Sequence, residues 1–227
     1  MPPPCAFPVD IGAPHSSAEI QFGHVQRPTH TNTSWEAARF EVYGHRWVHI
    51  GEPGYGVAVI NDSTYGHDVS RTVREDGGTT TTVRLSLVRA PRVPDPEADQ
   101  GRHRFTYALL PGAGVEDAVA EGYALNLPLR VADAAGAPGP VVSVQGEGVT
   151  VEAVKLADDE SGDVVVRLYE SRGGRATGVL TTGFPLVEAG ITDLLERPLA
   201  SAATDGDGVA VTLRPFEVQT LRLSRRS

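Results

Sequence analysis

The chain has 227 residues, a formal net charge of -9, 40% hydrophobic and 22% charged residues, and one cysteine, Cys5. These values are typical of a globular protein with one large or two ordinary domains. The acidic balance disfavours nucleic acid and anionic membrane surfaces as partners, because like charges repel. One cysteine excludes an intrachain disulfide and a four-cysteine zinc site, and it fits a cytoplasmic location. We expect neither a signal peptide nor a membrane-spanning helix.

Strand signals dominate the first part of the chain. The segments SAEIQFGHVQ, ARFEVYGHRWVHI and TTTTVRLSLVRA alternate apolar and polar residues, as half-buried strands do. RHRFTYALLP and YALNLPLRV are also expected to be strands, and the turn-forming stretches GEPG, REDGG and PGAG separate such segments. Trp35 and Trp47 are expected in the core, because each lies in an apolar alternating segment. Residues 115–121 form only a short candidate helical turn.

A Pro- and Gly-rich stretch at residues 132–140 predicts a domain boundary. Alternation restarts after it, and VTVEAVKL and VVVRLYE are predicted to form a hairpin around ADDESG, with Val166 in the core. GVLTTGF and VAVTLRPFEVQTLRL supply more strands, and residues 191–196 could form a helical turn. We therefore expect an all-β protein with one unit at residues 1–135 and another at residues 136–227, both β-sandwiches.

The sequence contains no recognisable complete set of catalytic residues. His45 and His49 are four residues apart, which on a strand separates them by roughly 13 Å, too far to share a metal ion. We expect them to be surface or groove histidines. The chain has no nucleophile elbow and no phosphate-binding glycine loop, and its acidic turns cannot be paired as glycosidase carboxylates from sequence alone. We predict no catalytic residue, no metal ligand and no cofactor-binding residue.

Polar side chains gather where the apolar strand GYGVAVI ends. Asn61 and Asp62 follow the strand directly, and Tyr65 and His67 come shortly after them. Asn and Asp at such positions can cap a turn through side-chain to backbone hydrogen bonds. The same cluster could instead line a ligand cleft, and both interpretations stay open.

Longer motifs point to a known family. EIQFGHVQRPTH, NTSWEAARFEV, EPGYGVAVINDSTYG and PDPEADQGRHRFTYALLP occur in this order, followed by VTVEAVKLADD and LRPFEVQTLRL. In sequence and spacing this set resembles the C-terminal half of α-mannosidases of glycoside hydrolase family 38, in the bacterial and cytosolic branch. The resemblance runs from about residue 7 to residue 223. It implies that residues 1–135 are part of a galactose-mutarotase-like super-sandwich and residues 136–227 a small Ig-like β-sandwich.

The resemblance also implies a function. In that family an upstream catalytic domain holds zinc and hydrolyses α-mannosides with retention, and none of that domain lies in this chain. The chain is then expected to be inactive alone and to dock on the catalytic domain. Asn61, Asp62, Tyr65 and His67 would line part of a composite cleft for the α-mannoside substrate. The sequence departs from the family pattern at Thr64, where a lysine is expected, and this puts one substrate contact in doubt.

An incomplete super-sandwich exposes strand edges and apolar faces, so the isolated chain is expected to self-associate. A free-standing carbohydrate-binding module is a rival function, because β-sandwiches often bind sugars, although fold alone does not decide function. A structural interaction domain without a ligand is the second rival.

Overall fold

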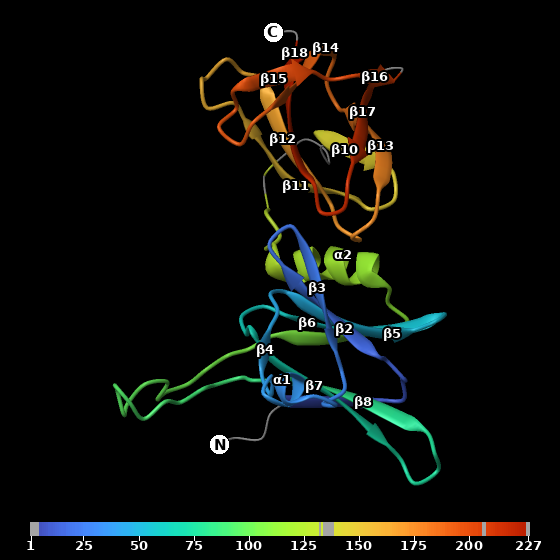
Figure 1. Ribbon diagram of the computed structural model, residues 1–227. Coiled ribbons are helices and arrows are strands. Elements are labelled where there is room, and N and C mark those ends of the chain that lie inside the picture. The colour runs from blue at the N-terminus through green and yellow to red at the C-terminus, as the bar shows by residue number, and fades with distance from the viewer. Residues whose placement is uncertain (1–4, 132, 134–138, 206–207, 226–227) are drawn as a thin grey trace. The chain divides into compact units, whose positions relative to one another are not determined.

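The computed structural model describes residues 5–131, 133, 139–205 and 208–225. Two compact units make up the chain, Met1–Leu129 and Arg130–Ser227. Strands account for nearly all of the regular structure in both units, which confirms the expected all-β fold (Figure 1). The predicted boundary after residue 135 lies slightly beyond this division, in a stretch that falls mostly outside the described residues.

Unit 1 contains two antiparallel sheets. Sheet A has the strand order β1-β8-β7-β4, and sheet B has the order β3-β2-β5-β6-β9. The elements of unit 1 are β1 (Cys5–Val9), β2 (His15–Ile20), β3 (Gly23–Pro28), α1 (Ser34–Ala37), β4 (Val42–Tyr43), β5 (Trp47–Glu52), β6 (Tyr55–Asn61), β7 (Gly66–Val73), β8 (Thr79–Leu85), β9 (Tyr107–Pro111) and α2 (Val115–Asn126).

The core of unit 1 lies between the two sheets. Val48, Ile50 and Val59 face it from sheet B, and Val83 and Leu85 face it from sheet A. All five side chains are at most 1% exposed. Burying an aliphatic side chain of this size stabilises a fold by about 1.5–3 kcal/mol. The predicted alternation of β8 is confirmed, because Val83 and Leu85 share its inward face.

Helix α2 is longer than the sequence predicts. It runs through the first residues of YALNLPLRV, so the strand expected there is wrong in its first half. Its buried residues Ala118 and Val119 pack on Trp47 and Ile60, on the face of sheet B that points away from sheet A (Figure 1). The alternation of apolar and polar residues in YALN is the reason that a strand was predicted there. These residues are helical because α2 packs its apolar side on the surface around Trp47.

The two tryptophans have opposite environments. Trp47 is fully buried, as predicted, but Trp35 is 79% exposed, so its predicted place in the core is wrong. Trp35 lies in the one-turn helix α1 and not in a strand. Thr33 and Glu36 form a capping box there: Thr33 Oγ1 accepts from Glu36 N at 3.3 Å, and Glu36 Oε2 accepts from Thr33 N at 2.9 Å. The capping box stabilises α1, in which no residue is buried, and the Trp35 indole therefore lies in solvent.

Unit 2 also contains two antiparallel sheets. Sheet C has the order β10-β13-β17-β16, and sheet D has the order β11-β12-β18-β14-β15. The strands of unit 2 are β10 (Val142–Gln145), β11 (Val149–Leu156), β12 (Val164–Glu170), β13 (Ala176–Thr182), β14 (Leu186–Thr192), β15 (Pro198–Ser201), β16 (Thr204–Asp205), β17 (Gly208–Leu213) and β18 (Val218–Arg225).

The predicted hairpin of unit 2 is present as β11 and β12. Val166 is fully buried in a cluster that includes Leu180 of sheet C and Leu221 of sheet D, which confirms its predicted core position. Val154, its cross-strand partner on β11, is 42% exposed because β11 is an edge strand. The register shifts between Val151 and Ala153, and this β-bulge keeps Val151 and Val154 on the same face of the sheet.

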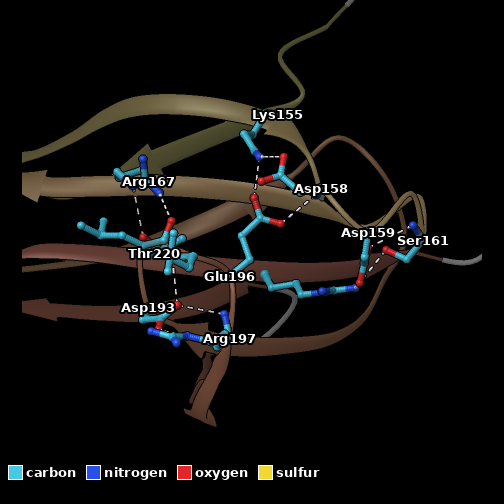
Figure 2. Close-up of polar contacts among 12 residues, drawn as sticks. Lys155, Asp158, Asp159, Ser161, Arg167, Asp193, Glu196, Arg197 and Thr220 are labelled. Carbon is cyan, nitrogen blue, oxygen red and sulfur yellow. Dashed lines mark hydrogen bonds and ion pairs between the residues drawn. The ribbon is translucent and has the colours of Figure 1, made fainter.

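The second expected helical turn, at residues 191–196, is instead the end of β14 and a tight turn. Asp193 Oδ1 accepts hydrogen bonds from the backbone N–H groups of Leu195 and Arg197, both at 2.9 Å. The largely buried Glu196 turns the other way and accepts from Asp158 N at 2.8 Å (Figure 2). Carboxylates that accept backbone N–H groups favour a turn over a helix here.

Candidate functional site

The polar segment comprises residues 61–67, from the last residue of β6 into β7. It begins with the buried Asn61, which caps the turn. Asn61 Oδ1 accepts hydrogen bonds from Ser63 N at 3.1 Å and Thr64 N at 2.8 Å. Its Nδ2 donates to the backbone oxygen of His45 at 2.9 Å. The side chain is therefore used within the protein, as the turn-capping interpretation expects.

Asp62 is exposed at the surface of the same turn. Its Oδ1 accepts from the Ser63 hydroxyl at 2.6 Å and from Thr106 N at 3.0 Å. The hydrogen bond from Ser63, together with those from Thr106, holds the pKa of Asp62 below its usual value. Asp62 thus presents a fixed negative charge to solvent.

Tyr65 is the most exposed ring of the segment, with 64% of its surface accessible. Its ring centroid lies 5.4 Å from that of His45, and its backbone oxygen accepts from Gly44 N at 3.0 Å. The same oxygen lies 2.9 Å from Nδ1 of His67. His67 is fully buried, and this burial lowers the pKa of its imidazole to about 4, so the ring is neutral near pH 7.

The ion pair between Glu19 and Arg46 and the helix α2 support the beginning of the polar segment. The buried Glu19 accepts from Arg46 N at 2.7 Å, and both of its oxygens contact the Arg46 guanidinium. The guanidinium carbon lies 3.8 Å from the centroid of the Tyr123 ring on α2. Asn126 at the end of α2 donates to Asn61 O at 3.0 Å. Sheet B and α2 thus hold the start of the polar segment from two sides.

The four predicted cleft residues therefore have different roles in the structure. Asp62 and Tyr65 reach solvent, whereas Asn61 and His67 point into the protein and support the backbone of the segment. The imidazole of His67 does not reach the surface, because it packs beneath Gly44. A cleft role stays a prediction, and Asp62 and Tyr65 are the residues able to touch a ligand.

A groove of about 840 Å³ lies elsewhere on unit 1, and the sequence did not predict it as a site. It occupies the face of sheet B that carries α2, next to the beginning of that helix. Residues 112–115 form one wall and the β5–β6 turn forms another. Polar side chains that line it include His15, Ser17, Gln26, His49 and Glu52.

Strand register builds the floor of this groove. Ser17 pairs with Gln26 on one side and with His49 on the other, so the three side chains form a row across β3, β2 and β5. Gly51 and Gly56 are also a cross-strand pair on this face. A Cβ atom at Gly51 would lie 2.9 Å from His49 Cε1, and one at Gly56 would lie 2.4 Å from His49 Nε2. The two glycines make room for the imidazole.

His49 is neutral in this position. Its Nε2 lies 2.8 Å from the backbone oxygen of Ala113, and burial is the main cause that lowers its pKa. The expectation of a surface or groove histidine agrees with this place. One signal in the sequence could have revealed the groove: His15, Ser17 and Gln26 are polar residues at positions that share one face of two neighbouring strands.

No three His, Cys, Asp or Glu side chains within residues 5–131, 133, 139–205 and 208–225 come together as possible ligands of one metal ion. The residues present therefore do not fit a zinc site. In those ranges no helix has the length and apolar character that crossing a membrane requires.

Two family models match the chain. The model described as "Glycosyl hydrolases family 38 C-terminal domain" matches residues 5–97. The model described as "Glycosyl hydrolases family 38 C-terminal beta sandwich domain" matches residues 148–221. The two matches fall in unit 1 and unit 2, respectively.

Curated relatives match over almost the whole chain. Alpha-mannosidase 2C1 of Homo sapiens is 42% identical over 229 residues, which cover 96% of this chain and 21% of the relative. Alpha-mannosidase G of Dictyostelium discoideum is 36% identical, covering 93% of this chain and 20% of the relative. Alpha-mannosidase of Saccharomyces cerevisiae is 32% identical, covering 96% and 22%. The chain thus spans about a fifth of the length of these relatives.

Solved structures share the fold. The crystal structure of an alpha-mannosidase from Enterococcus faecalis superposes with a TM-score of 0.67 at 22% sequence identity. It covers 96% of this chain and 25% of the bacterial chain. A second structure from the same organism, a protein in glycosyl hydrolase family 38, gives a TM-score of 0.66 at 20% identity. At these identities the likeness concerns the fold.

Proposed function

Because the chain belongs to the C-terminal β-sandwich region of glycoside hydrolase family 38, we propose that it serves as the non-catalytic C-terminal portion of an α-mannosidase. One observation carries this proposal. The chain matches relatives named α-mannosidase over 93 to 97% of its own length but only 20 to 22% of theirs. In this proposal the reacting groups lie in the part of the enzyme that this chain does not contain, and the chain docks on that catalytic domain.

The segment after β6 would then form one wall of the substrate cleft. The exposed ring of Tyr65 and the charged carboxylate of Asp62 are the groups that could meet the hydroxyl groups of an α-mannoside. Asn61 and His67 would act as positioning residues, because they hold the backbone that carries those two side chains. A rigid support of this kind is what a precise binding surface requires.

Hydrolysis with retention, and the zinc ion it would need, belong to the catalytic domain in this proposal. Zinc binds at least three protein side chains in catalytic sites, usually His, Asp, Glu or Cys. The described residues of this chain bring no such set together. Zinc would therefore be held outside this chain, and the chain's own contribution would be shape, hydrogen bonds and the charge of Asp62.

We expect the isolated chain to release no product from an aryl α-mannoside, with or without added zinc. In an α-mannosidase that carries this region, Tyr65→Ala should lower kcat/KM about tenfold or more, since the ring that would contact the substrate is removed. Tyr65→Phe keeps the ring and removes the hydroxyl, so comparing the two variants distinguishes the contribution of each. Leu199→Ala, which shortens an exposed side chain of unit 2, serves as the control.

Two results would contradict these expectations. Turnover by the isolated chain that disappears when one of its own residues is changed would show that it is catalytic. Unchanged kcat/KM in Tyr65→Ala and in Asp62→Ala would remove the cleft role while leaving the family membership intact.

We also propose a cytoplasmic location, which the resemblance to the cytosolic branch and the single Cys5 support.

Self-association of the isolated chain is a separate proposal. Its support is that Trp35, Phe40 and Tyr65 are largely exposed on unit 1 and that β1 is an edge strand. Light scattering at micromolar concentration is expected to give a dimer mass. A monomer that binds no hydrophobic dye would rule this out.

A further inference from the structure

The groove on sheet B is a built feature of unit 1. Its floor follows from strand register, which places Ser17, Gln26 and His49 in one row. Two inter-strand spacings of about 4.8 Å make this row roughly 10 Å long. The groove has a volume of about 840 Å³, which is within the range of small-molecule sites, roughly 300–1,000 Å³.

The row offers hydrogen-bonding groups that the protein leaves unused. Ser17 Oγ, the Gln26 amide and His49 Nδ1 make no hydrogen bond to another side chain or backbone group in the described part of the chain. The carbonyl oxygen of Ala113 can only accept, so His49 Nε2 carries the proton and Nδ1 keeps a lone pair. A hydroxyl and a carboxamide both donate and accept. The row therefore fits a ligand with several hydroxyl groups.

The charges around the groove disfavour an anion. No lysine or arginine is among the residues that line it, and the one carboxylate is Glu52. One oxygen of Glu52 already accepts from Gly12 N at 2.7 Å. The beginning of α2 is also occupied, because Asp117 accepts from Gly114 N at 2.8 Å. A phosphate or carboxylate ligand would meet negative charge here without a positive partner.

Tyr55 lies at the β5–β6 turn at the edge of the groove and is about half exposed. Its pairing with Glu52 places its side chain on the face of β6 opposite Gly56, so the groove offers a ligand polar groups and not an aromatic ring. Polar groups spaced along a groove suit the hydroxyl groups of a sugar ring. We propose that this groove binds a neutral pyranose sugar, with Ser17, Gln26 and His49 contacting hydroxyl groups. The proposal does not depend on the docking or cleft roles given above.

The test uses the chain of 227 residues in a two-dimensional ¹H–¹⁵N NMR titration. The probes are methyl α-D-mannopyranoside, methyl β-D-glucopyranoside and inorganic phosphate. We expect saturable shifts of the Gly51, Gly56 and Gly114 amides with at least one pyranoside, with a Kd on the order of millimolar. Gln26→Ala and Ser17→Ala should each weaken binding about fivefold, as expected for the loss of one hydrogen bond.

A matched variant separates groove binding from a general effect. Gln145→Ala removes the same side chain from an exposed position of β10 in unit 2 and should leave the affinity unchanged. Gly51→Ala adds a Cβ against the His49 ring and should weaken binding while keeping every polar group. Circular dichroism confirms that each variant is folded. The absence of saturable shifts with both pyranosides, stronger binding of phosphate, or unchanged affinity in Gln26→Ala would each overturn the proposal.

Discussion

Replacing Val166 with Asp is expected to unfold unit 2 and to leave the unfolding transition of unit 1 in place. Val166 is fully buried in the middle of β12, which pairs with β11 on one side and β18 on the other. An unpaired carboxylate there loses its hydration without gaining a partner, at a cost of several kcal/mol. That cost is comparable to the whole stability of a small domain, about 5–15 kcal/mol.

Chemical unfolding followed by circular dichroism and tryptophan fluorescence measures this effect. Both tryptophans lie in unit 1, so fluorescence reports on that unit, whereas circular dichroism reports on both. Val187→Asp introduces the same charge on β14 at a side chain that is 60% exposed, and it should change stability little. A Val166→Asp variant that unfolds like the parent would contradict the core assignment. Simultaneous loss of both units would contradict independent folding of residues 149–223.

The second large effect is expected from Glu19→Ala in unit 1. The carboxylate is buried and holds both the backbone N–H and the guanidinium of Arg46. Breaking one partner of a buried ion pair usually costs 3–5 kcal/mol, because the remaining charge is left uncompensated. The Arg46 side chain is 27% exposed, so water can solvate part of it, and we expect about 3 kcal/mol. The Tyr123 contact should weaken as well, which would loosen α2.

An exposed ion pair of the same unit provides the control for this variant. Asp10 contacts Arg74 at 2.7 Å, but its side chain is mostly in solvent, so Asp10→Ala should cost less than 1 kcal/mol. The midpoint of the fluorescence transition in urea measures both variants, and hydrogen exchange of the α2 amides reports on the helix. Equal midpoints for Glu19→Ala and Asp10→Ala would show that the buried pair adds no more than a surface pair.

Local patterns predicted much of the fold. The strands β8, β11 and β12 could be recognised because apolar and polar residues alternate along a strand that has one buried and one exposed face. The turn after β6 was also within reach, since Asn61 bonds to backbone groups only two and three residues ahead. Such contacts need no knowledge of distant parts of the chain.

Other elements were decided by contacts that no local pattern contains. Trp35 and Trp47 lie in similar sequence surroundings, yet Trp47 is buried beneath α2, where a Cβ at Gly122 would lie 3.0 Å from its ring, and Trp35 is exposed. The end of α2 alternates like a strand but remains helical, because its residues pack on sheet B and on Arg46. Tertiary packing outweighs propensity where the pattern is short.

The all-β class and the strands that form the two cores could be predicted from the sequence alone, because each depends on residues that are near one another in the chain. The motifs of the family are also local, whereas the turn cap at Asn61 was one of two interpretations that the sequence left open. Which polar residues share a surface depends on tertiary contacts. Gln26, Ser17 and His49 meet because β3, β2 and β5 pair in one register, and a shift by a single residue would turn each side chain to the opposite face. That register is fixed by burial of the apolar face between the two sheets, which no short stretch of sequence specifies.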